Sequence, residues 1–116
     1  LSSRLLNDRR GGTMRNEVIE LIERKRRQVL VHSFLYYQLN ENLISDFLFD
    51  DWCKHLVELQ NTFPKESEKA QYYEEFIGFD GSSGYDLPFH YPEIQNAGLK
   101  LIAYRDKVNK TLQKLK

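Results

Sequence analysis

The sequence predicts an all-α fold: an antiparallel helical hairpin plus a short helix, an irregular Gly-rich loop and a long C-terminal helix. Three observations predict it. Apolar residues recur at spacings of three and four over most of the chain, as expected for helices that bury one face. No segment shows the strict alternation of a half-buried strand. Asn, Ser and Pro residues, which are typical of helix ends, separate the periodic segments.

Length and composition limit the class of protein. A chain of 116 residues is expected to form one domain. The 17 basic residues balance the 17 acidic ones, so the protein lacks an overall positive field for nucleic acid. One Cys cannot form an internal disulfide, which suits a reducing compartment. The sequence has no signal-peptide pattern and no apolar run of the ~20 residues that cross a bilayer, so we expect a cytoplasmic protein.

Residues 1–13 have no sustained periodicity, and we expect them to be a flexible extension or a tag. Met14 is the only Met, and the first helical pattern begins two residues later. We hypothesise that Met14 is the natural start; a vector-derived tag and a genuine flexible arm are the alternatives. Residues 14–116 are assigned to a single helical domain.

The first long helix is predicted from about Asn16, a suitable N-cap, to Leu39. A run of four basic residues interrupts its apolar pattern: Arg24, Lys25, Arg26 and Arg27. The run could contact nucleic-acid phosphates weakly, or it could form a solvated face in which Glu20 and Glu23 precede Arg24 and Arg27 by four residues. The balanced net charge favours the solvated face, and nucleic acid is not an expected partner.

A short polar turn separates the first helix from the second. Asn40 to Leu43 break the helical pattern, and Ser45 or Asp46 caps the next helix. Pro64 ends that helix. Its predicted buried stripe consists of Phe49, Trp52, Cys53, Leu56, Leu59 and Phe63. Helices joined by so short a link pack antiparallel, so we expect the tyrosines at the end of the first helix to lie near the acids that open the second.

The remainder of the chain is predicted to contain two more helices and a loop. Ser67 is expected to cap a third helix that runs through Phe76. Residues 78–91 form an irregular Gly-bearing loop. Its Gly81-Ser82-Ser83-Gly84 could weakly bind a phosphate, and its aromatics Phe79, Tyr85, Phe89 and Tyr91 could form a protein-binding surface, but we expect them to fold back onto the core.

The C-terminal helix is predicted over residues 92–116, with Pro92 at its first position. Its apolar stripe is Ile94, Ala97, Leu101, Tyr104, Val108, Leu112 and Leu115. This spacing is close to a seven-residue repeat, which predicts packing along the hairpin or against a second copy as a homodimer.

The hairpin resembles a known family. Its residues His32-Ser33-Phe34-Leu35-Tyr36-Tyr37, Ile44-Ser45-Asp46, Phe49-Asp50, Leu56 and Leu59 match, in register and without a gap, the N-terminal Ia domain of bacterial NAD-dependent DNA ligases. In these ligases the helical Ia domain closes over the nicotinamide mononucleotide (NMN) half of NAD and presents it to a lysine of a separate adenylation domain. The resemblance implies five nucleotide-contacting residues: Tyr36, Tyr37, Asp46, Phe49 and Asp50.

The chemistry of these residue types suits that ligand. An aromatic ring can stack on the positively charged nicotinamide, and carboxylates can accept hydrogen bonds from ribose hydroxyls. Each residue also has a structural explanation. Tyr36 and Tyr37 could be interhelical core, and Asp46 is a good N-cap without any ligand. Phe49 replaces the Tyr that is usual in the ligases, which removes one hydroxyl.

No catalytic or metal site is expected. The Lys-x-Asp-Gly motif of the adenylation domain is absent, since Asp80-Gly81 follows Gly78-Phe79. Cys53 lacks the surroundings of a nucleophile. The three histidines, His32, His55 and His90, lie too far apart in the sequence for a typical metal-ligand pair. We therefore expect a protein that is not an enzyme and that requires no cofactor.

Two functions remain open at this point. The first is a non-catalytic, ligase Ia-like helical module that binds a protein partner and keeps a vestigial site for NMN or NAD. The second is a phage-type inhibitor or anti-defence protein that binds a host protein without any nucleotide; the phage context is an analogy.

Overall fold

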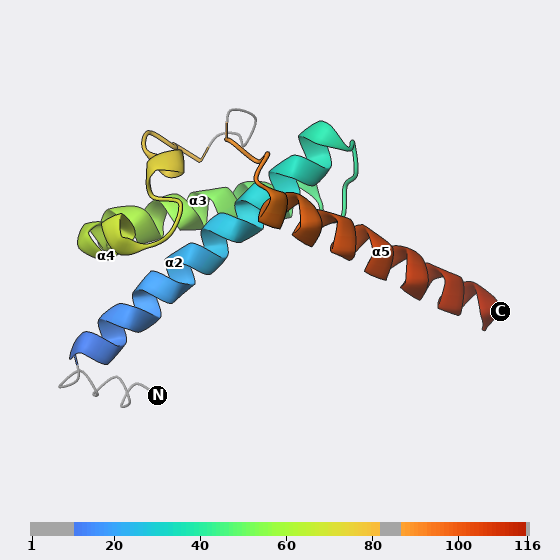
Figure 1. The fold of residues 1–116 in the computed structure, drawn as a ribbon, viewed down its shortest axis with the longest axis horizontal. Helices are drawn as coiled ribbons and strands as arrows, with labels where there is room; N and C mark the ends of the chain where they lie inside the picture. Colours follow the sequence, from blue (N-terminus) through green and yellow to red (C-terminus); the bar gives the residue numbers. More distant parts are fainter. Residues whose placement is uncertain (1–10, 82–86, 116) are drawn as a thin grey trace.

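The computed structural model describes residues 11–81 and 87–115 (Figure 1). These residues contain helices and no strand, which confirms the all-α prediction. The elements in order are α2 (Gly11–Ser33), the π-helix η2 (Phe34–Gln38), α3 (Asp46–Thr62), α4 (Pro64–Lys69), the 3-10 helix η3 (Glu74–Phe76) and α5 (Pro92–Lys114). Helix α2 starts earlier than the predicted Asn16 and includes residues 11–13, which were assigned to the extension. Residues 1–10 lie outside the description, and Met14 as the natural start stays a hypothesis.

Helices α2 and α3 form the predicted hairpin, with α3 running back beside α2, and α4 contacts both of them (Figure 1). The core lies between them and under the first turns of α5. Cys53 and Leu56 of the predicted α3 stripe are buried, while Phe49, Leu59 and Phe63 pack against the core with partial exposure. The ring of Trp52 stands edge-on to His32, with centroids 5.2 Å apart. The hairpin thus follows the apolar spacing of the sequence.

The turn between the two helices has the predicted chemistry. Asn40 adopts a left-handed backbone with φ 55°, a conformation that Asn tolerates better than most residues. Ser45 is the N-cap of α3, and its Oγ accepts a hydrogen bond from the backbone N–H of Leu48 at 3.0 Å. Phe63 is the C-cap of α3, directly before Pro64.

The prediction of one continuous third helix from Ser67 to Phe76 is wrong. Helix α4 ends at Lys69, Tyr72 has a left-handed φ of 71°, and η3 follows. The carbonyls of Ala70 and Gln71 accept hydrogen bonds from Arg26 instead of from the next helical turn. Ser67 is not a cap but a buried residue inside α4. The side chain of Arg26, which comes from α2, therefore takes the place of the backbone hydrogen bonds that would have continued α4.

The expectation that the four basic residues form a solvated face is wrong for Arg26. Arg26 is only 1% exposed, and its guanidinium donates to Gln60 Oε1 (2.8 Å), Ser67 Oγ (2.6 Å) and the two carbonyls. Burial lowers the pKa of Arg26 to about 10, so the group stays charged at neutral pH. Glu23, expected to face Arg27, accepts a hydrogen bond from the backbone N–H of Gln71. Buried and fully engaged, Arg26 cannot belong to a phosphate-binding face.

Helix α5 packs on the hairpin through its N-terminal half, as far as Ile102 and Arg105. Ile94 and Gly98 are buried against α2 and η2, and the rest of the helix projects away from the body (Figure 1). Packing along the whole hairpin is therefore a wrong prediction: Leu101, Tyr104, Leu112 and Leu115 are exposed. Gly98 allows the close crossing, since a Cβ there would lie 2.9 Å from Phe34 Cδ2. The two helices cross at this point and then diverge.

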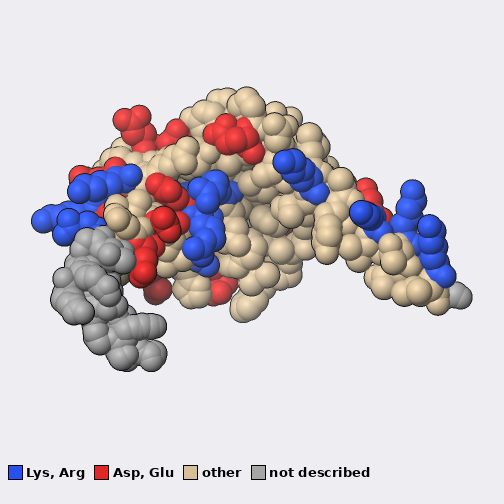
Figure 2. Space-filling view, turned by 60° about the horizontal axis from the view of Figure 1, so that its bottom comes forward, with Lys and Arg blue, Asp and Glu red and all other residues tan. Residues whose placement is uncertain are grey.

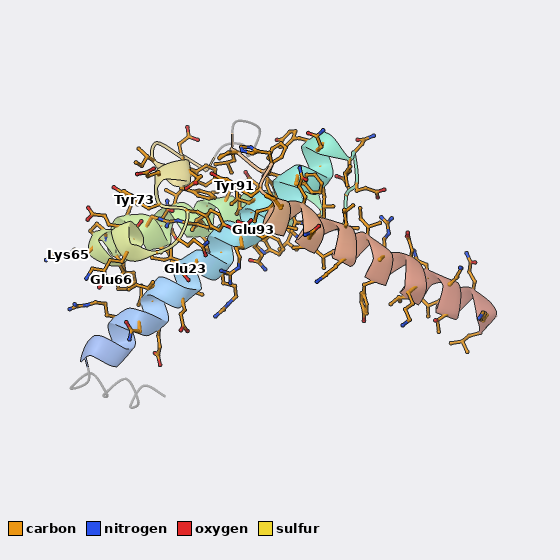
Figure 3. All side chains as sticks on the ribbon, in the orientation of Figure 1. Glu23, Lys65, Glu66, Tyr73, Tyr91 and Glu93 are labelled. Atoms are coloured by element: carbon orange, nitrogen blue, oxygen red, sulfur yellow. The ribbon has the colours of Figure 1, made fainter. Side chains whose placement is uncertain are left out.

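The aromatics of the 78–91 loop fold back where the structure describes them. Phe79 stands edge-on to Phe76, and Phe89 lies beside Phe34. The hydroxyl of Tyr91, which is labelled in Figure 3, donates to Glu75 at 2.6 Å. Gly81 is buried against Val57 and Cys53. Tyr85 and most of the predicted phosphate-binding loop, residues 82–84, lie outside the described part. Within that part, no helix is long and apolar enough to cross a membrane.

Candidate functional site

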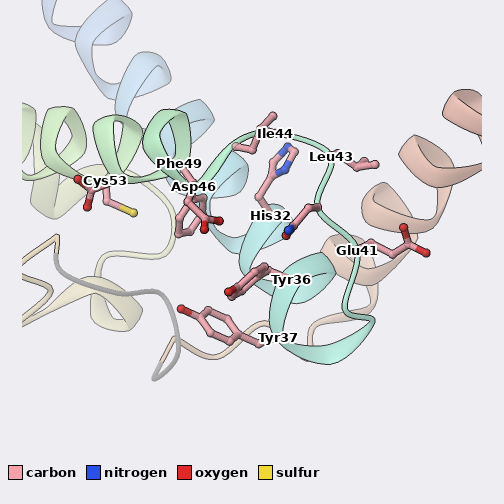
Figure 4. A pocket seen from close by; sticks show the side chains of 11 residues that line it. His32, Tyr36, Tyr37, Glu41, Leu43, Ile44, Asp46, Phe49 and Cys53 are labelled. Atoms are coloured by element: carbon pink, nitrogen blue, oxygen red, sulfur yellow. The ribbon is translucent and has the colours of Figure 1, made fainter.

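A cleft of about 300 Å³ opens at the joint of the hairpin, between η2, the turn and the first turns of α3 (Figure 4). All five residues that the resemblance implied line it: Tyr36, Tyr37, Asp46, Phe49 and Asp50. The remaining lining residues are His32, Glu41, Asn42, Leu43, Ile44 and Cys53. The fold therefore brings the predicted residues together around one concave surface.

The two tyrosines enter the cleft from the π-helix. The N–H of Leu39 bonds to the carbonyl of Phe34 at 3.3 Å, so this last turn is wider than an α-turn. Tyr36 and Tyr37 stand edge-on with ring centroids 4.7 Å apart, and Tyr37 is stacked parallel to Phe89. Tyr36 is 41% exposed, whereas Tyr37 is half-buried. Tyr36 thus offers the accessible ring, and Tyr37 ties the cleft to the loop.

Helix α3 supplies the acids and Phe49. Asp50 forms an ion pair with Lys54 one turn later at 3.0 Å, while Asp46 is exposed. Among the described residues no basic side chain pairs with Asp46. Phe49 packs partly against the core, so it stabilises the fold whether or not it also contacts a ligand. One free carboxylate and one partly neutralised carboxylate face the tyrosines.

The structure adds a polar contact that sequence reasoning missed. Arg105 of α5 donates from Nη1 to Glu41 Oε1 at 2.7 Å, across a separation of 64 residues. The hydrogen bond to Glu41, with a second one to Asp106, raises the pKa of Arg105. No local pattern relates two residues so far apart, but the contact joins α5 to the rim of the cleft.

The lining of the cleft includes two groups, His32 and Cys53, whose charged forms are disfavoured by burial. Burial lowers the pKa of His32, which favours the uncharged imidazole. Cys53 is 1% exposed, and burial, with the nearby Asp50 carboxylate, raises the pKa of its thiol to about 11. The thiolate needed of a nucleophile is therefore disfavoured. No cluster of three or more metal-ligand side chains occurs among the described residues.

Large apolar side chains on the same elements point into solvent. Phe47 on the first turn of α3 is 82% exposed, and Leu48 and Leu39 are 38% and 36% exposed. Phe47 and Leu48 lie between the cleft residues Asp46 and Phe49 in the sequence, and Leu39 follows η2 directly. Exposed apolar groups beside a concave polar surface are typical of a surface that a partner covers.

Comparisons with known proteins agree with the resemblance in part. The chain is 39% identical over 49 residues to the DNA ligases of Thermotoga petrophila and Thermotoga maritima, and equally to that of Thermotoga neapolitana. The matched region covers 42% of this chain but only 7% of each ligase, so the chain spans a small part of the length of these relatives. No family model matches the sequence. No solved structure matches it.

Proposed function

We propose that this chain is a ligase-related helical module that holds the NMN half of NAD in the hairpin cleft, while a protein partner supplies the other wall. One observation carries this proposal: the five residues implied by the ligase resemblance line a single cleft. The partial similarity to bacterial DNA ligases supports the same direction. The module itself is assigned no catalytic step.

The residue chemistry suits a cationic ring and a ribose. The accessible ring of Tyr36 can stack against nicotinamide, whose positive charge adds a cation–π attraction. The carboxylates of Asp46 and Asp50 can accept hydrogen bonds from ribose hydroxyls and offset the ring charge. A volume of about 300 Å³ is at the small end for ligand pockets, which suits half of a dinucleotide.

The same charges imply a two-sided site. Among the described residues the cleft lining includes Glu41, Asp46 and Asp50 but no Lys or Arg. Lys54 and Arg105 approach the cleft only as ion-pair partners of Asp50 and Glu41, so a phosphate meets no unpaired cation among the described lining residues and would point away from the acids. The partner must provide the cations for the phosphates, and the exposed Phe47 and Leu48 give it an apolar surface on which to dock.

Calorimetry with NMN and with its reduced form, whose ring is uncharged, tests the nucleotide site. We expect millimolar or weaker binding of NMN, a loss of roughly tenfold in Tyr36→Ala, and weaker binding of the reduced form. Tyr104→Ala is the matched control, because this tyrosine is also exposed but lies on α5 away from the cleft. The site is rejected if NMN does not bind with a Kd of about 20 mM or lower, or if the Tyr36→Ala and Tyr104→Ala variants bind NMN with equal affinity.

A second candidate is protein binding without any nucleotide, as in a phage-type inhibitor of a host protein. The 82% exposure of Phe47 favours this function, since a large aromatic ring in solvent is a typical interface anchor. Surface plasmon resonance against a purified bacterial DNA ligase tests it. In this case Phe47→Asp abolishes binding, Tyr36→Ala leaves it unchanged, and NMN has no effect on the affinity.

A further inference from the structure

A second concave surface lies on the side of α2 that faces α5, and it has a different character from the hairpin cleft. This groove has a volume of about 410 Å³ and an apolar floor of Val31, Ile94, Ala97 and Leu101. Arg24 and Arg27 of α2 and Lys100 of α5 line it as well. Figure 2 shows Lys and Arg side chains at the centre of the view and on the projecting arm, with Asp and Glu side chains beside them. The groove is therefore apolar inside and basic at its edges.

The projecting part of α5 extends the groove floor. Helical spacing places Tyr104, Val108 and Leu115 on the face of Leu101, and Leu112 at its edge. Tyr104 is 68% exposed, Leu112 53% and Leu115 77%. Together with the groove this apolar stripe is about 30 Å long, from Ile94 to Leu115. Within the described residues nothing covers it beyond the first turns.

Basic side chains follow one edge of the stripe. Lys100, Lys107 and Lys114 recur every seven residues, so they form a column beside it. Arg105 lies on the opposite edge, where its partners are Glu41 and Asp106. Glu93, the acidic residue of the groove lining, accepts a hydrogen bond from the hydroxyl of Tyr72 at 2.7 Å and lies at the end of the stripe.

These charges argue against a second copy of the chain as the occupant. In an antiparallel pair of α5 helices the lysine columns would face each other, and in a parallel pair Lys100 would face Arg105 of the other copy. Both arrangements place like charges along the seam, which is unfavourable. A flat bilayer surface fits poorly too, because the apolar residues of the floor lie in a groove between α2 and α5.

We propose that the groove and stripe bind an amphipathic helix of a protein partner, with apolar residues at spacings of three and four and acidic residues along both flanks. The apolar side of such a helix fills the groove between α2 and α5. Its acids pair with Arg24 and Arg27 on one side and with the lysine column on the other. The groove shares one lining residue, His32, with the hairpin cleft, and its other lining residues are different.

The probe for this interaction is a fluorescein-labelled helical peptide of three heptads, with leucine at the apolar positions and glutamate on both flanks. A second peptide carries lysine in place of every glutamate. Fluorescence anisotropy is measured with the full chain at low and at high salt. We expect binding of the glutamate peptide, weaker at high salt, and no binding of the lysine peptide.

Charge reversal provides the decisive comparison. The triple variant K100E/K107E/K114E, at three exposed positions, is expected to lose roughly tenfold or more in affinity for the glutamate peptide and to gain affinity for the lysine peptide. Leu112→Ser should weaken binding. Leu99→Ser is its matched control, because Leu99 is 50% exposed but lies off the stripe. Circular dichroism verifies that each variant is folded.

Four outcomes would overturn the proposal. They are equal affinity for the two peptides, binding of neither peptide at several hundred micromolar, a dimer in light scattering that Leu112→Ser dissociates, and sedimentation with phosphatidylserine vesicles in the absence of peptide binding. The third outcome would identify a second copy as the occupant, and the fourth would identify a membrane surface.

Discussion

Replacement of Arg26 by methionine removes the guanidinium that joins three parts of the fold while keeping the unbranched aliphatic stem. The wild-type group donates hydrogen bonds from α2 to α3 at Gln60, to α4 at Ser67, and to the segment after α4 at Ala70 and Gln71. Its cation also lies 5.7 Å from the centroid of the Phe76 ring. The variant therefore breaks the contacts that hold the chain after α4 in its non-helical course.

The structure sets the size of the effect. Two of the acceptors, the Ala70 carbonyl and Ser67 Oγ, are buried, and each costs about 1–3 kcal/mol when it loses its donor. The wild-type protein in turn pays to bury the cation, as the lowered pKa of Arg26 indicates, and methionine removes that cost. We expect Arg26→Met to lower the free energy of unfolding by about 3 kcal/mol, a large fraction of the ~5–15 kcal/mol typical of a domain.

Urea denaturation monitored by circular dichroism measures this change at pH 7. Arg27→Met is the matched control, since Arg27 is exposed on the same helix and its loss should change stability by less than about 0.5 kcal/mol. Ser67→Ala should destabilise the wild type by more than it destabilises the Arg26→Met variant, because the two side chains share a hydrogen bond. Equal stabilities of Arg26→Met and Arg27→Met would refute this account of the core.

Three further predictions follow from single residues. Gly98→Ala should destabilise the protein by about 1–3 kcal/mol in thermal unfolding, because its Cβ would lie 2.9 Å from the ring of Phe34. Since Ala favours helices over Gly, a stabilised variant would contradict the close crossing of α5 over η2 at this residue. Burial lowers the pKa of His32 in the folded protein, so below about pH 6.5 the unfolded state binds more protons than the folded state. The free energy of unfolding should therefore decrease from pH 7 to pH 5. His32→Gln should flatten this decrease in urea titrations, and a slope no flatter than that of the exposed-site variant His90→Gln would contradict it. Cys53 should resist Ellman's reagent at pH 8 in the folded protein and react in guanidinium, because burial raises the pKa of its thiol to about 11; rapid labelling of the folded protein would exclude a buried thiol.

Local signals in the sequence predicted the hairpin and its joint. The apolar spacing of α3, the serine cap and the left-handed asparagine each act within a few residues, so they can be read without a structure. The candidate site residues were also accessible to sequence, through the resemblance of the hairpin to a ligase domain. They lie in two segments joined by a short turn, so antiparallel packing of the two helices is sufficient to bring them around one cleft.

Contacts between distant segments decided the rest. Arg26 appears in the sequence as one of four basic residues, and only the acceptors offered by α3 and α4 make it a buried group that ends α4. The stripe of α5 is a regular apolar repeat, yet α5 contacts the hairpin only in its N-terminal part, around the crossing at Gly98 and as far as the hydrogen bond of Arg105 to Glu41. Helical spacing determines which residues share a face, because it depends on backbone geometry alone. What covers that face depends on the approach of other elements, which for this protein the sequence by itself did not determine.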